Sequence, residues 1–579
     1  MKTQLLSFAI VLISNFIFCQ NTSIPDTNFE NFLETRAADG SVVPLGDPTS
    51  LGDGVMNGMV PTSKINGLTE IDLFNQSIAD LTGIKDFTSL TILKARGNQL
   101  TSIDVSTLAL TYLDIYDSNL NTIDVSLNTA LEHLNVSQNL LTDLDVDANT
   151  SLTYLAFGGN NLISIDISLN TALTVLGAGN CSLTSLDVLT NTELESLACS
   201  NNSFMTLDLS NNLKLETLYC DGNSSLNSLT LPITNTLTRL DCYNSNLSGT
   251  LDVTNFTNLE VLWCYNNNFS GTLDLSNNIN LTNVDCGDNN FTGITMPNDV
   301  DTLTRFICDN NNLSGTLNVS NNEVLQRVEC YNNTSLTSIN LPSTSTLTRL
   351  VCYSTGLTSL DASGLMGLEY IDLYYCSSLT SLMLPPTTTL TSLWAYTTGL
   401  SSLDFTNNTG LINMDIANGD FTSIDVSMLP NLNQLYCNES DLLTSLNVKN
   451  GNNPSMSTMW AQDNPILGCI QVDNKALSEA YSGWDKDVTA TYEESCTFSL
   501  EEFNLSSIAI HPNPSKDIFE IDLNQNANYK LFNIQGQEVL RGSFLQGLNK
   551  LNVTSLSSGL YVLNVKSDLG SISRKLIKR

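Results

Sequence analysis

The sequence predicts a mostly β solenoid of the α/β type, with about 19 coils and one curved parallel sheet, followed by a small C-terminal β-sandwich. Three observations predict it. A leucine recurs in steps of 20 to 22 residues from Leu68 to Leu432, and a last step of 24 residues reaches Met456. Each unit contains a short segment in which apolar and polar residues alternate, as in a half-buried strand. After Thr497 this repeat ends and the charge balance changes.

The first residues are typical of an exported protein. Lys2 precedes an apolar run from Leu5 to Phe18, and polar Gln20 follows. Because the run is shorter than the ~20 residues that a membrane-spanning helix needs, we interpret residues 1–19 as a secretory signal peptide that is cut after Cys19. Lipoprotein processing at Cys19 stays open as an alternative, although no small residues directly precede this cysteine.

Residues 20–67 precede the repeats and are predicted to cap them. The terminal coils of a solenoid expose core residues unless another element covers them. The stretch "IPDTNFENFLETRA" predicts a short helix that begins at Pro25 and Asp26, because Phe29, Phe32 and Leu33 then form one apolar stripe.

Residues 68–467 hold 19 units, each counted from a leucine at position 0. A unit reads L-x-x-L-x-(L/C)-x-x-N-x-(L/F) and, after about three residues, (L/I)-D-(V/L)-S-x-N-T. Positions 0, 3, 5, 10 and about 13 are predicted to point inward, where only stacked units can bury them. Position 8 is Asn in ten units, and its amide is expected to bond the turn and the next coil. This pattern resembles the leucine-rich repeat family.

Cysteine occupies position 5 in nine units. Because position 5 faces inward, these residues are predicted to form a ladder of buried, reduced thiols that act as small apolar side chains. Neighbouring Cβ atoms would lie too far apart for an unstrained disulfide, but disulfides and a bound metal stay open as alternatives. Cys181 and Cys376 occupy position 8, where the family accepts Cys in place of Asn. The ladder consists of Cys199, Cys220, Cys242, Cys264, Cys286, Cys308, Cys330, Cys352 and Cys437.

Residues 468–496 follow the repeats and are predicted to form the C-terminal cap. Cys469 and Cys496 are the only cysteines outside both the signal peptide and the repeats. Since an exported chain folds in an oxidising compartment, we expect a disulfide between them. Trp484 is expected in the core of this cap.

Residues 497–579 differ from the rest of the chain in charge and in pattern. They carry 9 Lys and Arg against 7 Asp and Glu, whereas residues 1–496 carry 14 against 52. Alternating segments such as "YKLFNI" and "LYVLNV" lie between Gly and Asn turns and predict a β-sandwich. A carbohydrate-binding β-sandwich is one alternative for this domain.

Four stretches of this tail carry a closer resemblance. They are "IAIHPNPSKD" (508–517), "LFNIQGQEVLRG" (531–542), "LSSGLYVLNV" (556–565) and "RKLIKR" (574–579). In this order they resemble the type A sorting domain of the type IX secretion system. The resemblance implies the type IX secretion machinery as a partner, and a location that is extracellular or on the outer-membrane surface of a Gram-negative bacterium.

Positions 2, 4 and 6 are expected to line the concave face of the sheet. They hold 12 of the 17 tyrosines and three of the four tryptophans. Aromatic side chains with no core to fill are favoured at interfaces, although stacking and Arg–carboxylate pairs between coils could serve stability alone. We predict a ligand-binding surface for an extracellular protein or glycan. Its residues are Tyr219, Arg239, Tyr243, Trp263, Tyr265, Arg305, Arg327, Tyr331, Arg349, Tyr353, Tyr370, Tyr374, Trp394, Tyr396, Tyr436 and Trp460.

A second ladder consists of aspartates at the L-D-V part of eleven units, from Asp104 to Asp425. Stacked carboxylates could hold calcium, and the alternative is a solvated, turn-capping face. The Gly-rich nonapeptide of calcium-binding β-rolls is absent from the sequence. We expect neither a metal nor a cofactor.

The residue types favour binding over catalysis. A net charge of -36 disfavours nucleic acid and anionic membrane surfaces as partners. His133 and His511 are the only histidines, so the sequence offers very few residues that could act as the base of a Ser-His-Asp triad. Asp285 and Asp309 could in principle cleave glycosides, but neighbouring arginines are expected to keep both ionised. We therefore predict a secreted binding protein and no enzyme, and a structural or adhesive coat component is the alternative.

Overall fold

The computed structural model describes residues 20–298, 301–343, 346–496, 509–523, 526–567 and 570–579. The predicted signal peptide lies outside these ranges. The chain divides into two compact units, Met1–Tyr492 and Glu493–Arg579. Among the residues so described, no helix is long and apolar enough to cross a membrane.

The N-terminal cap contains the predicted helix. In α1, Asp26 Oδ1 accepts hydrogen bonds from the amides of Asn28 and Phe29, as an N-cap residue does. Phe29 and Leu33 are fully buried and Phe32 nearly so, which confirms the predicted stripe. The elements of the cap are β1 (Asn21–Ser23), α1 (Thr27–Glu34), β2 (Met59–Pro61) and α2 (Thr62–Ile65).

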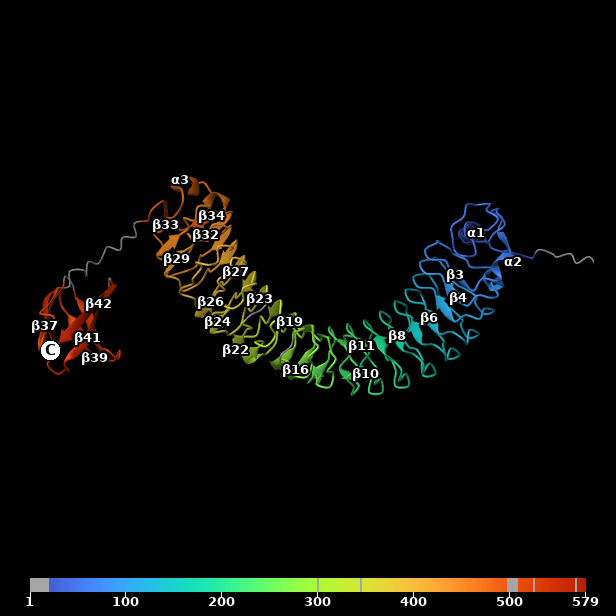
Figure 1. Ribbon diagram of the computed structural model, residues 1–579, viewed down its shortest axis with the longest axis horizontal. Coiled ribbons are helices and arrows are strands. Elements are labelled where there is room, and N and C mark those ends of the chain that lie inside the picture. Colours follow the sequence, from blue (N-terminus) through green and yellow to red (C-terminus); the bar gives the residue numbers. More distant parts are fainter. Residues whose placement is uncertain (1–19, 299–300, 344–345, 497–508, 524–525, 568–569) are drawn as a thin grey trace, which may run out of the picture. The chain divides into compact units, whose positions relative to one another are not determined.

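The repeats stack into one parallel sheet of short strands that follows the inner side of an arc (Figure 1). Each of the 19 units supplies one strand at positions 2 to 4, and β34 of the C-terminal cap adds a twentieth. The sheet is open, with β3 and β34 at its edges. We call it the main sheet. Its strands are β3 (Glu70–Asp72), β4 (Ile92–Lys94), β5 (Tyr112–Asp114), β6 (His133–Asn135), β7 (Tyr154–Ala156), β8 (Val175–Gly177), β9 (Ser196–Ala198), β11 (Thr217–Tyr219), β13 (Arg239–Asp241), β15 (Val261–Trp263), β17 (Asn283–Asp285), β19 (Arg305–Ile307), β21 (Arg327–Glu329), β23 (Arg349–Val351), β25 (Tyr370–Asp372), β27 (Ser392–Trp394), β28 (Asn413–Asp415), β30 (Gln434–Tyr436), β32 (Thr458–Ala461) and β34 (Trp484–Lys486).

Short parallel sheets also form on the outer side of the arc, and the repeat pattern did not predict them (Figure 1). Most of them lie at or next to the L-D-V part of the units, and β33 and β35 belong to the C-terminal cap. Their strands are β10 (Thr206–Asp208), β12 (Ser228–Thr230), β14 (Ser248–Gly249), β16 (Asn268–Asp274), β18 (Asn290–Thr295), β20 (Ser314–Asn318), β22 (Ser335–Asn340), β24 (Ser359–Asp361), β26 (Ser381–Met383), β29 (Ser423–Asp425), β31 (Ser445–Asn447), β33 (Cys469–Gln471) and β35 (Thr491–Glu493). The short helices of this unit beyond the N-terminal cap are η1 (Ile84–Asp86), η2 (Asn453–Ser455) and α3 (Lys475–Ser478).

One apolar core runs through all the coils. In the unit of Leu90, positions 0, 3, 5 and 10 are fully buried, as predicted. The apolar residue at about position 13 is also buried in most units, such as Leu144 and Leu207, although Ile103 is only partly buried. Val105 at position 15 is fully buried as well.

Buried asparagines bond one coil to its neighbour. The Asn98 amide donates to the carbonyl oxygens of Leu73 and Ala95, at 2.9 Å each, and its Oδ1 accepts the Ile78 amide at 3.0 Å. The neighbour is therefore the preceding coil, and the prediction of the next coil was wrong. The N of the S-x-N-T segment forms a second ladder, in which Asn128 donates to two carbonyls of the preceding coil.

The nine position-5 cysteines are fully buried, which confirms their inward orientation. They are free thiols, as are Cys181 and Cys376. The Sγ atoms of Cys330 and Cys352 lie 3.3 Å apart, in hydrogen-bond contact. Burial raises the pKa of Cys264 well above its usual value, so this thiol stays protonated and unreactive. Within the described residues, no group of three or more His, Cys, Asp and Glu is placed to hold a metal ion.

The C-terminal cap ends the main sheet and carries the predicted disulfide between Cys469 and Cys496. Trp484 on β34 is 9% exposed, and its Nε1 donates to the Met456 carbonyl at 3.0 Å. Tyr481 and Tyr492 pack edge-on against its ring. Trp484 is therefore part of the cap core, as predicted.

The C-terminal unit contains two antiparallel sheets around its own core, which agrees with the predicted β-sandwich. Phe519, Leu531, Phe544 and Leu563 are among the buried residues of this core. One sheet consists of β36 (Ala509–His511), β37 (Ile518–Leu523) and β40 (Gly547–Asn552). The other consists of β39 (Glu538–Phe544), β38 (Ala527–Asn533), β41 (Gly559–Ser567) and β42 (Gly570–Lys578).

Candidate functional site: the concave face

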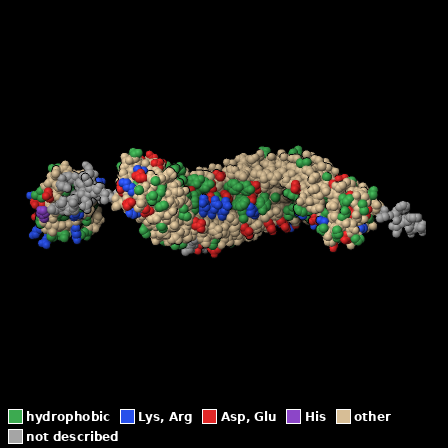
Figure 2. Space-filling view, turned by 90° about the horizontal axis from the view of Figure 1, so that it is seen from above, with side chains coloured by type: hydrophobic (Ala, Val, Ile, Leu, Met, Phe, Trp, Pro, Cys, Tyr) green, Lys and Arg blue, Asp and Glu red, His purple; other side chains and the backbone are tan. Residues whose placement is uncertain are grey.

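The concave face consists of the side chains at positions 2, 4 and 6 of the main sheet. Of the 16 residues predicted as its binding surface, 15 are half-buried and Trp460 is 46% exposed. In a view into the open side of the arc, Lys and Arg side chains gather near the middle of this face, bordered by hydrophobic and acidic ones (Figure 2). Contacts divide the predicted residues into three groups along the sheet.

The first group surrounds Arg239 on β13. Its guanidinium lies between two rings, with Cζ 4.5 Å from the centroid of Trp263 and 5.2 Å from that of Tyr219. Arg239 Nη2 also donates to Asp241 Oδ2 at 2.9 Å. Tyr243 and Tyr265, from adjacent coils, stack with centroids 4.5 Å apart. These contacts hold both the cation and the rings in fixed positions.

The second group is a row of three arginines on adjacent strands. Arg305, Arg327 and Arg349 are register partners on β19, β21 and β23. The Nε atoms of Arg327 and Arg349 both donate to Glu329 Oε1, at 2.7 and 3.2 Å. Arg305 Nη2 lies 3.5 Å from Asp285 Oδ2. We call these three residues the arginine row.

Tyrosines flank the arginine row. Tyr331 and Tyr353 stack with centroids 4.3 Å apart and planes 14° apart. The guanidinium of Arg349 lies 4.0 Å from the ring centroid of Tyr370, whose hydroxyl donates to Asp372 Oδ2 at 3.3 Å. The row is therefore bordered on its C-terminal side by a cation–π contact.

The third group is an aromatic cluster toward the C-terminal cap. Tyr374, Trp394 and Tyr396 meet edge to face, and Trp394 also contacts Tyr436, which meets Trp460. The Tyr374 hydroxyl donates to Asp415 Oδ2, and the Tyr396 hydroxyl donates to Glu439 Oε2 at 3.0 Å. The buried Trp394 Nε1 has no partner in the part of the chain that the structure describes.

The stacked tyrosine pairs turn their ring edges, and not their ring faces, toward the solvent above the concave face. Tyr331 and Tyr353 belong to adjacent coils, and their centroid separation of 4.3 Å is close to the ~4.8 Å distance between strands. The ring normals therefore run along the solenoid, and each ring covers the face of its neighbour. A ligand above the sheet meets hydroxyls and ring edges, so this pair is no flat platform for a sugar ring.

Buried carboxylates support the concave face. Burial raises the pKa of Asp241, Asp285, Asp372 and Asp415 above the usual range. It raises the pKa of Asp309 to about 6, against the opposing effect of a hydrogen bond from Tyr331. Arg305 lowers the pKa of Asp285, as expected, but burial has the larger effect. With a pKa of about 6, Asp309 is still mostly ionised at pH 7, and burial rather than an arginine sets the direction of its shift.

Three rings form a separate stack at the N-terminal end of the concave face. The imidazole of His133 lies between Tyr112 and Tyr154, with both centroid distances 4.0 Å. Burial, together with the nearby charge of Arg96, lowers the pKa of His133 to about 4. His133 is thus a neutral member of a stack at neutral pH, and no acid or base near pH 7.

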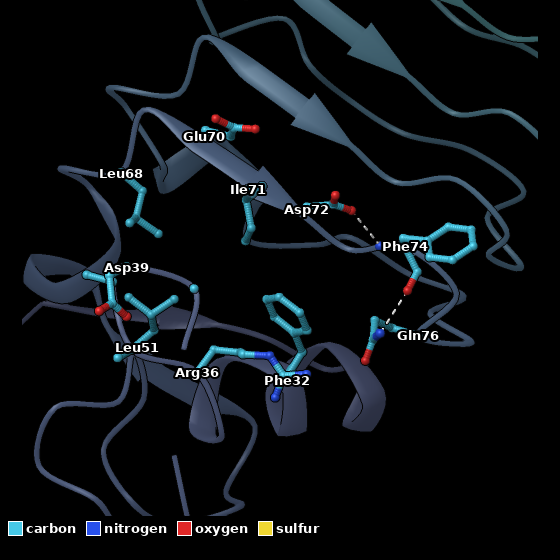
Figure 3. A pocket seen from close by; sticks show the side chains of 13 residues that line it. Phe32, Arg36, Asp39, Leu51, Leu68, Glu70, Ile71, Asp72, Phe74 and Gln76 are labelled. Atoms are coloured by element: carbon cyan, nitrogen blue, oxygen red, sulfur yellow. Dashed lines mark hydrogen bonds between the residues drawn. The ribbon is translucent and has the colours of Figure 1, made fainter. Parts of the chain in front are cut away.

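A cavity of about 450 Å³ lies between the N-terminal cap and β3, and the sequence did not predict it. Figure 3 shows Phe32 and Arg36 of the cap below Ile71 of β3, with Phe74 to the side. The Arg36 guanidinium packs over the Phe32 ring, 5.2 Å from its centroid. No pattern within the repeats identifies this cavity, because it arises where the cap meets the first coil.

The aspartates of the second ladder cap turns on the outer side of the arc. Asp124 Oδ1 accepts the Ser126 amide at 2.9 Å, and the same bond to the residue two positions on recurs throughout the ladder. The eleven residues are Asp104, Asp124, Asp145, Asp166, Asp187, Asp208, Asp252, Asp274, Asp361, Asp404 and Asp425. This agrees with the turn-capping alternative.

Comparisons with known proteins identify the tail. Residues 509–579 match the family of secretion system C-terminal sorting domains. A domain of this family implies export from the cell or to its surface. Curated proteins yield no match to the chain.

Solved structures offer distant likenesses to the solenoid. "Functional domain of InlJ from Listeria monocytogenes includes a cysteine ladder" is 22% identical, with 96% of this chain and 98% of that chain covered and a TM-score of 0.44. YopM from Yersinia enterocolitica WA-314 is 18% identical, with 72% and 91% covered and a TM-score of 0.44. An internalin, InlF, from Listeria monocytogenes str. 4b F2365 is 20% identical, with 62% and 95% covered and a TM-score of 0.38. The fold assignment rests on the coils themselves.

Proposed function

We propose that this leucine-rich repeat solenoid with a secretion sorting tail binds an extracellular protein or glycan through its concave face. The observation that carries the proposal is the row of half-exposed arginines and aromatic rings on the main sheet. Desolvated carboxylates such as Asp309 and Asp415 hold it in place. Burying a charged group makes the free energy of folding less favourable. A sheet whose only role is stability would therefore not be expected to contain buried carboxylates.

The sorting tail supports the proposed route of export. A type IX translocon would recognise residues 509–579 and deliver the solenoid to the medium or to the outer-membrane surface. The outer-membrane location and the type IX machinery as the partner of the tail are parts of this proposal.

Binding without catalysis suits the residues of the concave face. His133 is stacked between two rings with a pKa of about 4, and His511 belongs to the C-terminal unit. Asp309 has a pKa of about 6, but its neighbours Tyr331 and Asn310 occupy it as donors. A general acid must lie within hydrogen-bond reach of the leaving group. The carboxyl of Asp309 instead accepts hydrogen bonds from its neighbours.

A structural role in a surface coat is the second candidate, and the stacking favours it. Tyr331 and Tyr353 cover each other's faces, and Arg239 fills the space between two rings. Such contacts add about 0.5–1.5 kcal/mol each to the stability of the sheet. They require no ligand.

The two candidates are separated by aromatic truncation on the concave face. The full chain from Gln20 to Arg579 with Trp263, Tyr265 and Trp394 replaced by alanine should lose capture of extracellular protein and of arrayed glycans. The matched control replaces Leu127, Ile163 and Met205, which are 62–67% exposed on other surfaces of the coils, and should bind as the native chain does. Equal capture by both variants, at unchanged unfolding temperature, would exclude the concave face as the binding surface.

A further inference from the structure

The two edges of the main sheet differ in how the caps cover them. At the C-terminal edge, the Trp484 amide of β34 donates to the Tyr481 carbonyl at 3.3 Å, and the two rings pack against each other. At the N-terminal edge, β3 pairs with β4 on one side, and residues of its other side line the cavity beside the N-terminal cap. A strand with one unpaired side presents a row of backbone donors and acceptors.

Alternate residues of β3 direct their backbone groups to opposite sides of the strand. The Leu73 amide donates to the Lys94 carbonyl at 2.7 Å. The Thr69 carbonyl accepts the Ile92 amide at 3.1 Å. The odd-numbered residues therefore bond β4, and the even-numbered residues direct their amides and carbonyls to the free side, as the pattern of a parallel pair requires.

The even-numbered residues are also the ones that line the cavity. From this segment the lining takes Leu68, Glu70, Asp72, Phe74 and Gln76, together with the inward side chain of Ile71 (Figure 3). In the part of the chain that the structure describes, the backbone amides and carbonyls of Glu70 and Asp72 have no hydrogen-bond partner. Two donors and two acceptors thus face the cavity in line, at the spacing of a strand.

The cavity has an apolar floor beside this row of backbone groups. Phe32, Leu51 and Ile71 line it with buried side chains, and Leu68 is partly buried. Phe74 lines its side and is 58% exposed. The volume of about 450 Å³ lies within the range of about 300–1,000 Å³ that is typical of ligand pockets. An occupant that satisfies both features has a backbone to pair with β3 and an apolar side chain for the floor.

The charges at this edge favour a basic side chain next to the apolar one. Lys94 Nζ pairs with Glu70 Oε1 at 2.6 Å. Asp72 is exposed and has no ion pair within the described ranges. Among the described lining residues Arg36 is the one cation, and it packs over the Phe32 ring. Asp72 is therefore the carboxylate that remains for a cation of the occupant.

We propose that the free edge of β3 binds an extended segment of an extracellular partner protein as an additional strand of the main sheet. The amides and carbonyls of the segment pair with those of Glu70 and Asp72. Because successive side chains of a strand point to opposite faces, one enters the cavity over Phe32 and Leu51, and the next lies beside Asp72. The partner segment therefore alternates apolar and basic residues. This site goes beyond the proposed function, since it uses none of the three groups on the concave face.

N-methylated peptides test the backbone pairing directly. The probe is a fluorescein-labelled heptapeptide of alternating lysine and valine, titrated by fluorescence anisotropy with the chain from Gln20 to Arg579. Methylating the amides of all lysines, or of all valines, blocks one side of the strand and leaves charge and side chains unchanged. One methylated peptide should bind at least tenfold more weakly than the unmodified probe, and the other within about twofold of it. Equal affinities of the two methylated peptides would overturn the proposal.

A proline on the free edge gives the matching test on the protein. Asp72→Pro removes an amide of the free side, whereas the pairing with β4 uses the amides of Ile71 and Leu73. It should weaken the probe at least tenfold. Asp72→Asn keeps the amide and should weaken it only two- to threefold, and the charge control Asp485→Asn at the other edge should not change it. Native affinity in a folded Asp72→Pro variant, as judged by circular dichroism, would contradict the proposal.

The occupant is decided by two further measurements. A heptapeptide of alternating glutamate and valine should bind at least tenfold more weakly than the lysine probe, and equal binding would contradict the role of Asp72. Sedimentation should show no dimer that Asp72→Pro dissociates, because such a dimer would assign the edge to a second copy of this chain. The variant with Trp263, Tyr265 and Trp394 replaced by alanine should bind the probe like the native chain. If the methylated peptides fail to differ while this variant still loses extracellular capture, the inference fails and the proposed function stands.

Discussion

Aspartates recur at two positions of the coil, on the outer side of the arc in eleven units and at position 4 of the concave face in six. The pKa shifts at the two positions have opposite directions. Aspartates on the outer side of the arc accept the amide two residues on, and those at position 4 of the concave face, such as Asp372 and Asp415, make the same bond. Yet the pKa of Asp124 is lowered by the Ser126 hydroxyl and amide, whereas the pKa of Asp372 and Asp415 is raised by burial. Because aspartates at both positions make the same local hydrogen bond, the difference in burial decides whether their pKa is raised or lowered.

This difference supports the proposal that the concave face is the binding site and that the outer aspartates stabilise the scaffold. A solvated Asp in a turn costs little and stabilises the turn when ionised. A desolvated Asp on the main sheet costs free energy unless it holds something, and here it holds tyrosine hydroxyls and guanidinium groups. Perturbed titratable groups of this kind are typical of functional surfaces.

The largest expected effect comes from Asp309→Asn. The pKa of Asp309 is raised to about 6, mainly by burial and also by the charges of Asp288 and Asp285, so ionisation at pH 7 destabilises the fold. With an unfolded pKa near 3.8, stability is lost as the pH rises from 4 through 6. A difference of about two pKa units corresponds to about 3 kcal/mol. The variant should therefore be about 2–3 kcal/mol more stable than the native chain at pH 7 in urea unfolding.

The same comparison has an internal control. At pH 3 the side chain at position 309 is mostly neutral in the folded and the unfolded states of both proteins, and their free energies of unfolding should agree. Asp420→Asn, at an exposed position of another coil, should stay within about 0.5 kcal/mol of the native chain at pH 7. A destabilised Asp309→Asn at pH 7 would mean that the carboxylate gains more from Tyr331 than it loses by burial.

His133 tests the effect of burial on a basic group of the concave face. Burial disfavours its charged form, so its pKa is lowered to about 4 in the folded chain. The stability that it contributes is complete above pH 6.5 and is lost as the pH falls toward 4. Discounted for its partial exposure, the loss between pH 7.5 and pH 5 is about 1–2 kcal/mol. His133→Gln should remove this part of the pH dependence in thermal unfolding, and an unchanged slope would contradict the buried stack.

The turn aspartates should give the smallest effect. Hydrogen bonds from Ser and Thr lower the pKa of Asp124 and Asp404. Their contribution is present above the unfolded pKa and lost as the pH falls below 4. Asp124→Asn should therefore shift only the acid limb of an unfolding curve and leave binding by the concave face unchanged. A loss of binding in this variant would show that the two rows are not separate.

Much of the fold follows from the sequence because the repeat imposes it. Leu93 and Cys308 are buried for the same reason, since a fixed period places each equivalent residue inside the coil. The helix at Asp26, the cap core at Trp484 and the Cys469–Cys496 disulfide also followed from local patterns.

What the sequence could not give depends on contacts between coils. The stacking of Tyr331 on Tyr353 requires the strand spacing as well as the residue types. The pKa of Asp309 depends on how deeply its side chain is buried, and the sequence pattern does not reveal the degree of burial. The cavity at Arg36 arises from one junction that occurs once in the chain, so no periodic signal identifies it.

Titration of individual carboxyl groups tests the central comparison most directly. With aspartate labelled at its carboxyl carbon and signals assigned through Asp309→Asn and Asp104→Asn, the chemical shifts should give a midpoint near 6 for Asp309 and near 2 for Asp104, which Lys85 and Ser106 stabilise as the ion. Midpoints that coincide near 3.8 would mean that the concave carboxyls are as solvated as the turns, and that the face they support has no special electrostatic design.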